Sequence, residues 1–124
     1  MIGPILIYIG AFLAFGWGTA HLFPTRNIVA GFGEISADNR RIITMEWLTE
    51  GVALIFVGVL VAIVTCVDRT SPVSTAVYWT TFGALNILSV VSIFTGFRNT
   101  FFAFKLCPFI FSGASVLIVA GSYL

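Results

Sequence analysis

Glu46 and Glu50 are the residues whose type and spacing most directly indicate chemistry in this chain. They lie one helical turn apart within the otherwise apolar segment Ile42–Val67, so a helix places both side chains on one face. A carboxylate inside a membrane-spanning helix is costly unless it has a partner or a proton. The pair therefore predicts a polar site, with Glu50 as its principal group because Glu50 lies deeper in the segment.

Other polar and aromatic residues fall in the same half of the membrane if each apolar segment is a helix that rises about 1.5 Å per residue. Trp17 and His21 are one turn apart and share a face. His21 titrates near neutral pH, so His21 and Glu50 are the candidates for catalytic proton transfer. We expect a polar pocket in the cytoplasmic half of the protein. Its candidate ligand-binding residues are Glu46, Glu50, His21, Trp17, Asn86, Ser89 and Lys105.

Each of these residues also has a structural interpretation. Glu46 suits an interfacial position, because its carboxylate favours the positive N-terminal end of a helix. Glu50 can be locked to Lys105 or hydrogen-bonded to Asn86. His21 can be a capping group near a helix end, and Asn86 can bridge two membrane helices. The sequence leaves both interpretations open, because it does not fix how each helix is rotated about its axis.

Four apolar segments must position these residues. Of the 124 residues, 59% are hydrophobic and 9% are charged, whereas about a quarter are charged in soluble domains. Each segment is near the ~20 residues that a helix needs to cross a bilayer, and barrel strands would instead alternate polar and apolar residues. We predict an all-α fold, a single four-transmembrane-helix bundle over residues 1–124. The expected spans are Gly3–Phe23, Ile42–Val67, Val73–Phe94 and Phe101–Leu124.

Two local patterns refine this picture. The first connection, Pro24–Arg41, has an apolar middle, Ile28–Gly33, so we expect it to lie in the interface or to fold back as a short helix. Ser36 and its neighbours offer capping groups before the second spanning helix. In the first spanning segment, Gly10, Ala14 and Gly18 form a stripe of small residues that lets a neighbouring helix approach closely.

The basic residues predict an orientation. Five of the six lie in or beside the first and third connections, and one lies in the second: Arg26, Arg40, Arg41, Arg98 and Lys105, against Arg69. Because cytoplasmic loops carry the excess of Lys and Arg, loops one and three should face the cytoplasm and both termini the outside. The net charge of +1 gives no basic surface for nucleic acid. The expected partners are the lipid bilayer and a homo-oligomer or larger membrane complex.

No metal site is predicted, because two cysteines and one histidine fall short of a structural zinc set. The lone histidine also departs from a bis-histidine haem site within one chain. No cofactor is assigned from the residues themselves. A quinone would be compatible with the expected pocket.

Two stretches resemble the DoxX-like family of small four-helix membrane proteins. They are Gly16–Pro24, which reads GWGTAHLFP, and Glu46–Gly51, which reads EWLTEG and is followed by Gly58. Members tend to carry an acidic residue followed by glycines in the second helix, as at Glu50, Gly51 and Gly58. The resemblance implies a four-helix membrane fold and, for part of that family, an association with quinol oxidation and redox-linked membrane complexes.

Three functional hypotheses follow. The leading one is a non-catalytic accessory or ligand-binding subunit whose pocket holds a quinone-like or lipid-like molecule. The second is a redox-linked membrane enzyme subunit in which Glu50 and His21 transfer protons, which requires each group to lie within hydrogen-bond reach of its proton. The third is a small proton- or cation-coupled transporter in which Glu50 binds the ion.

Overall fold

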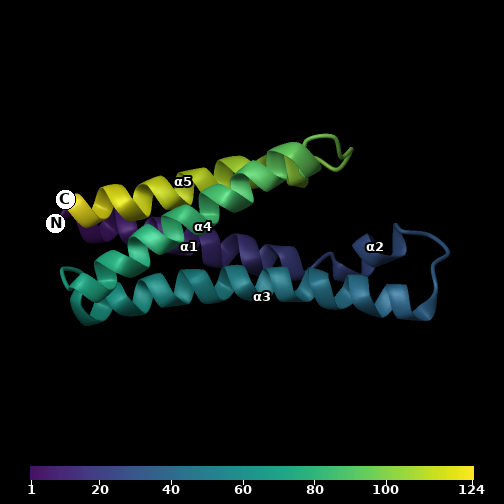
Figure 1. The fold of residues 1–124 in the computed structure, drawn as a ribbon, viewed down its shortest axis with the longest axis horizontal. Helices are drawn as coiled ribbons and strands as arrows, with labels where there is room; N and C mark the ends of the chain where they lie inside the picture. The colour runs from purple at the N-terminus through teal and green to yellow at the C-terminus, as the bar shows by residue number, and fades with distance from the viewer.

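The computed structural model describes residues 1–124 as a bundle of four long helices and one short helix, without a β-strand (Figure 1). The four long helices are each long and apolar enough to cross a membrane. The predicted all-α bundle is therefore confirmed, and the chain is a multi-pass integral membrane protein. The helices are α1 (Ile2–Leu22), α2 (Thr25–Ala30), α3 (Ala37–Asp68), α4 (Pro72–Gly96) and α5 (Ala103–Tyr123).

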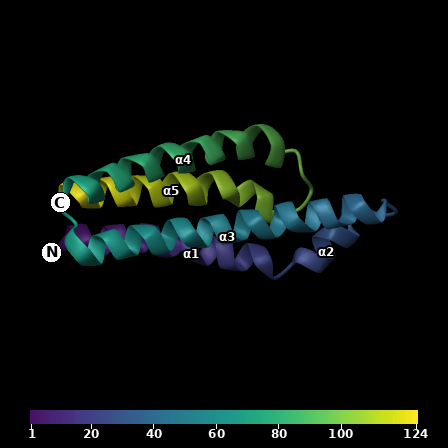
Figure 2. The ribbon, with the colours of Figure 1, turned by 60° about the horizontal axis from the view of Figure 1, so that its bottom comes forward.

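The largest difference from the predicted spans is at the start of α3. This helix has 32 residues and begins at Ala37, five residues before the expected Ile42. Ser36 is its N-cap, and the Ser36 side chain accepts a hydrogen bond from the backbone N–H of Asn39 at 3.2 Å. Hydropathy marks where a helix enters hydrocarbon, whereas capping marks where it begins, so α3 extends past the apolar stretch. The first connection, expected either to lie in the interface or to fold back as a short helix, forms the short helix α2, which contacts this extension (Figure 2).

Helix α1 lies between α3 and α5 and packs closely on both, whereas α4 packs mainly on α5 (Figures 1 and 2). A Cβ atom added to Gly10 would lie 2.7 Å from the carbonyl oxygen of Ala114 on α5. One added to Gly18 would lie 2.6 Å from the carbonyl oxygen of Gly51 on α3. The stripe of small residues thus allows close contact with both α5 and α3. Gly10 and Gly18 are eight residues apart, and at 3.6 residues per turn this separation rotates the contact face by about 80°.

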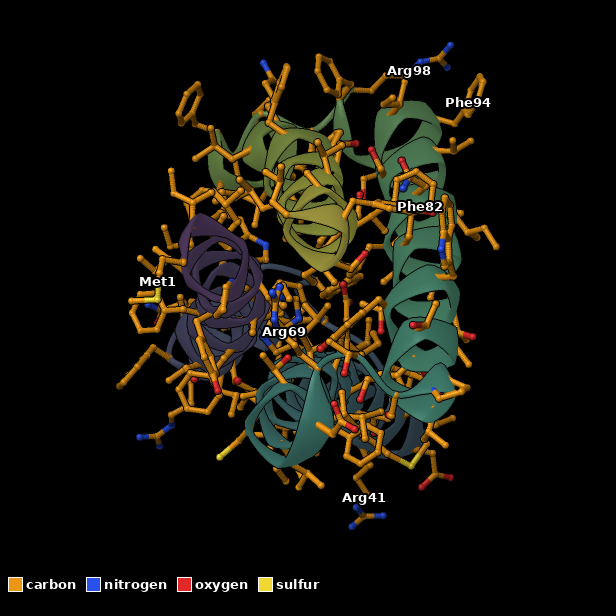
Figure 3. All side chains as sticks on the ribbon, turned by 90° about the vertical axis from the view of Figure 1, so that its left-hand side faces the viewer. Met1, Arg41, Arg69, Phe82, Phe94 and Arg98 are labelled. Atoms are coloured by element: carbon orange, nitrogen blue, oxygen red, sulfur yellow. The ribbon has the colours of Figure 1, made fainter.

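Polar contacts hold α3 and α4 together at the end that carries the short turn between them. The buried Tyr78 hydroxyl and Thr65 hydroxyl lie 2.8 Å apart, and the Ser74 hydroxyl donates to the carbonyl oxygens of Val64 and Asp68. Arg69 points into the middle of this end of the bundle (Figure 3). Away from the turn α4 diverges from α3, and the two helices touch little.

The α1–α3 contact yields a matched test of helix packing. A Cβ at Gly58 would lie 2.6 Å from the carbonyl oxygen of Ala11, whereas a Cβ at Gly83 meets no atom within 4 Å. We expect Gly58→Ala to destabilise the protein by about 1–3 kcal/mol through overpacking, and Gly83→Ala to leave stability unchanged or slightly higher. Thermal unfolding in detergent micelles measures both. Equal melting temperatures for the two variants would contradict the close α1–α3 approach.

Candidate functional site

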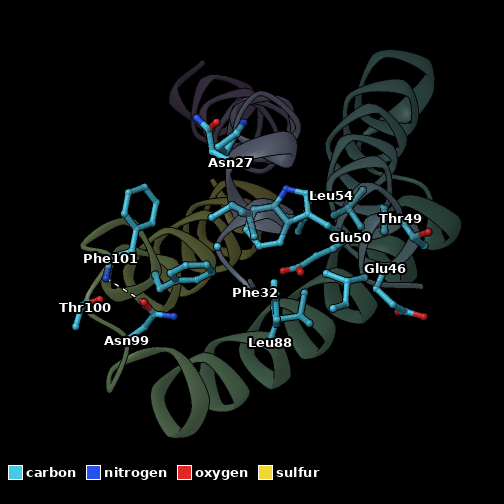
Figure 4. Close-up of a pocket in the computed structure, with 18 residues that line it drawn as sticks. Asn27, Phe32, Glu46, Thr49, Glu50, Leu54, Leu88, Asn99, Thr100 and Phe101 are labelled. Carbon is cyan, nitrogen blue, oxygen red and sulfur yellow. Dashed lines mark hydrogen bonds between the residues drawn. The ribbon is translucent and has the colours of Figure 1, made fainter. Parts of the chain in front are cut away.

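A pocket of about 1130 Å³ lies between α3 and α4 at the end where the two helices diverge (Figure 4). Leu54 and Val57 of α3 and Leu88 of α4 form its apolar wall, while Ile28 of α2 and Phe101 of the α4–α5 connection lie around its mouth. Of its 18 lining residues, 10 are hydrophobic. This volume slightly exceeds the about 300–1,000 Å³ typical of small-molecule sites, so the pocket has room for a sizeable amphipathic molecule.

Both predicted carboxylates line this pocket. The carboxylate of Glu50 points toward the middle of the pocket, whereas that of Glu46 points away from it (Figure 4). The Glu50 side chain is 51% exposed. Neither glutamate forms an ion pair with a lysine or an arginine. The two residues therefore share a helix face, but Glu50 alone is directed into the cavity.

His21 is the side chain that faces Glu50. Its Nε2 atom lies 3.5 Å from Oε2 of Glu50, and the His21 side chain is only 10% exposed. This buried nitrogen has no hydrogen-bond partner. The arrangement follows from the α1–α3 packing, because His21 comes one turn after Gly18 and Glu50 directly precedes Gly51, the two glycines at which the backbones touch. A fixed imidazole and a carboxylate that reaches the pocket can exchange or share a proton.

Trp47 fixes the position of the His21 ring. The two rings are stacked, with centroids 3.8 Å apart and planes inclined by 16°, and the indole Nε1 donates a hydrogen bond of 2.8 Å to the His21 carbonyl oxygen. The candidate residues predicted from the sequence did not include Trp47, so this role was missed. The signal was its spacing, because Trp47 and Glu50 at i,i+3 lie on the same face of one helix.

A smaller cavity of about 220 Å³ adjoins the first and shares Pro24, Trp47, Phe101 and Phe104 with it. Trp17 and His21 line this smaller cavity and not the larger one. Cys107 of α5, a free cysteine that sequence reasoning did not assign to the site, also lines it. Trp17 therefore belongs to the smaller cavity and does not reach the main pocket.

Three of the predicted ligand-binding residues lie elsewhere. Asn86 donates to the Ser115 hydroxyl at 3.0 Å, and the Ser89 hydroxyl lies 2.9 Å from that of Ser112, so both bridge α4 to α5. Lys105 lines neither cavity and forms no ion pair. The structure therefore does not bring Asn86, Ser89 and Lys105 to the cavities that Glu50 and His21 line. For Asn86 and Ser89 the reason is that the polar face of α4 is turned toward α5. Asn86 thus has the role of bridging two membrane helices, one of the two interpretations that the sequence left open.

The fold and the site together define a class, that of multi-pass membrane proteins with a pocket between diverging helices. No group of three or more His, Cys, Asp or Glu side chains is placed to hold a metal ion. No model of a protein family, no curated protein and no solved structure matches the chain. The geometry of Glu50, His21 and the pocket therefore carries the functional argument.

The interhelical role of Asn86 is testable by substitution. We expect Asn86→Ala to lower stability by about 0.6 kcal/mol and by no more than about 1.7 kcal/mol, the average and the maximum measured for hydrogen bonds between membrane helices. Thr95→Ala is the matched control, because the exposed Thr95 hydroxyl bonds only to the Val91 carbonyl of its own helix. Chemical unfolding in mixed micelles compares the two. An Asn86→Ala protein with wild-type stability but weakened ligand binding would instead place Asn86 in the binding site.

Proposed function

We propose that this chain is a non-catalytic, ligand-binding membrane subunit that holds a quinone-like or lipid-like molecule between α3 and α4. One observation carries the proposal: an apolar pocket bounded by two membrane-spanning helices with the carboxylate of Glu50 directed into it. Small-molecule sites commonly combine apolar walls with a few convergent polar groups. An amphipathic ligand fits this pocket, because its apolar part can lie against the apolar walls and its polar part beside Glu50.

The length and composition of the pocket support this class of ligand. From Glu46 to Val57 the α3 wall covers about 16 Å at 1.5 Å per residue. Polar side chains lie at one end of this wall, and Ala53, Leu54 and Val57 follow toward the other. A head group fits beside Glu50, with an apolar tail against α3 and Leu88 of α4. Because both walls belong to membrane-spanning helices, such a molecule can enter from the bilayer.

The pocket belongs to the cytoplasmic side in this proposal. The first and third connections lie at the same end of the bundle and both contribute lining residues, such as Asn27 and Asn99 (Figures 2 and 4). These connections carry the excess of basic residues, so they face the cytoplasm by the positive-inside rule. Both termini then lie on the outer side.

A redox-linked role is the second candidate. The observation that favours it is that His21 Nε2 and Glu50 Oε2 lie 3.5 Å apart, which places two groups able to carry a proton side by side. The resemblance to the DoxX-like family, part of which is associated with quinol oxidation, also favours a redox-linked role and remains a prediction. Electron transfer would need a carrier from a partner protein, which is consistent with a subunit of a larger complex.

The binding proposal is tested by filling the pocket. We expect Leu88→Trp to remove a co-purifying small molecule that native mass spectrometry detects on the wild type, because the larger side chain occupies the wall. Ile87→Trp is the matched control, since Ile87 is 65% exposed and lies outside the pocket. Identification of the molecule as a quinone would favour the redox candidate. Identical spectra for wild type and Leu88→Trp, with no bound molecule in either, would contradict the proposal.

The orientation is tested by cysteine labelling in a variant without Cys66 and Cys107. We expect Tyr123→Cys to react with a membrane-impermeant maleimide in intact cells, because the C-terminus lies outside. Asn99→Cys should react only after the cells are permeabilised, because the third connection faces the cytoplasm. The reverse pattern would place the pocket on the outer side.

A further inference from the structure

We infer that the ligand of this pocket is a lipophilic cation whose ammonium group lies beside Glu50. The inference rests on the proposed binding function and specifies the class of molecule that is bound. Its basis is the combination of charge, aromatic side chains and an incompletely paired carboxylate at one end of an apolar cavity.

The charge balance of the pocket is negative. The 18 lining residues include Glu46 and Glu50 and no lysine, arginine or histidine. His21 is the one cationic side chain that contacts either glutamate, and it contacts only Glu50. Glu50 is the carboxylate directed into the cavity, and no lysine or arginine pairs with it. Electrostatic complementarity favours a positively charged head group and disfavours a phosphate or carboxylate.

The other basic residues do not neutralise this charge. Arg40 and Arg41 line a separate surface groove on α3, where the Arg41 guanidinium pairs with Asp38 at 3.2 Å. Arg26, Arg98 and Lys105 form no ion pair with any carboxylate. No lysine or arginine side chain is therefore paired with Glu50, and a bound cation would contact its carboxylate directly.

The pairing of Glu50 with His21 is also incomplete. The His21 Nε2 atom is buried without a hydrogen-bond partner, although it lies 3.5 Å from Glu50 Oε2. The other contact of the His21 ring is its stack on Trp47, at 3.8 Å between centroids. Half of the Glu50 side chain stays exposed on the cavity side. The carboxylate is therefore free to accept an ammonium group.

Aromatic rings supply the second feature expected of a cation site. Phe32, Trp47, Phe101 and Phe104 all line the pocket. Phe104 meets both Trp47 and Phe101 edge to face, at centroid distances of 5.9 and 5.8 Å, which holds these three rings as one cluster. The faces of aromatic rings attract ammonium groups, and quaternary ammonium is commonly bound by such clusters. A neutral quinone would use the rings but leave the carboxylates without a counter-charge.

The test is a scintillation-proximity assay with tritium-labelled tetradecyltrimethylammonium and the full chain in dodecyl maltoside. We expect saturable binding that Glu50→Gln weakens about tenfold, equivalent to about 1.4 kcal/mol. Glu46→Gln should weaken binding less, because the Glu46 carboxylate points away from the cavity. Glu34→Gln is the matched control for loss of one negative charge, since Glu34 lies outside the pocket. Circular dichroism melts establish that the variants are equally folded.

Competitors separate this inference from the function on which it rests. Unlabelled tetradecylamine should displace the probe, whereas tetradecanol and tetradecyl phosphate should not. Displacement by phosphatidylcholine, lost in Glu50→Gln, would support ammonium recognition and identify a lipid head group as its source. Equal displacement by tetradecanol, with binding lost only in Leu88→Trp, would overturn the cation inference and keep the pocket. Binding unaffected by Leu88→Trp and by Glu50→Gln would overturn both.

Discussion

The close approach of α1 to its two neighbours is the constraint on which the rest of the structure depends. Within a bilayer, helices gain little by hiding apolar surface from one another, so association relies on packing that small residues permit. Gly18 and Gly51 allow the backbones of α1 and α3 to touch. His21 follows the first of these glycines by one turn, and Glu50 directly precedes the second, so their separation of 3.5 Å is set by the backbone contact. The site is thus a product of helix packing rather than of a loop.

The two ends of the bundle differ for a related reason. At one end a short turn joins α3 to α4, and hydroxyl groups of Thr65, Ser74 and Tyr78 tie the two helices together. At the other end α4 runs alongside α5, and hydrogen bonds of Asn86 and Ser89 hold the two helices together. Helix α4 packs mainly on α5, so with increasing distance from the turn it diverges from α3. The pocket occupies the space between them.

This division of roles explains which features the sequence predicts. Hydropathy and length indicate four spanning helices, and the apolar residues before Gly33 indicate the short helix α2, because these signals are local. The rotation of each helix is not local, since it depends on which small residues meet across an interface. The shared pocket of Glu46 and Glu50 follows from their local spacing on one helix, whereas Asn86, Ser89 and Lys105, which lie on other helices, line neither cavity. Trp47 was missed because its partner, the His21 ring, belongs to another helix.

The length of α3 resolves how a carboxylate is tolerated at this site. Its 32 residues extend for about 48 Å, which exceeds the ~30 Å hydrocarbon core by about 18 Å. Asp68 and Arg69 end the helix at one face, so the excess falls at the N-terminal end, where α2 contacts α3.

Glu50 lies about 20 Å from Ala37 at 1.5 Å per residue and hence close to the edge of the hydrocarbon. His21 lies in the last turn of α1, at the same level. A carboxylate there retains contact with water, while Leu54 and Val57 beyond it face the apolar interior. The pocket therefore spans the boundary at which an amphipathic molecule changes from polar to apolar.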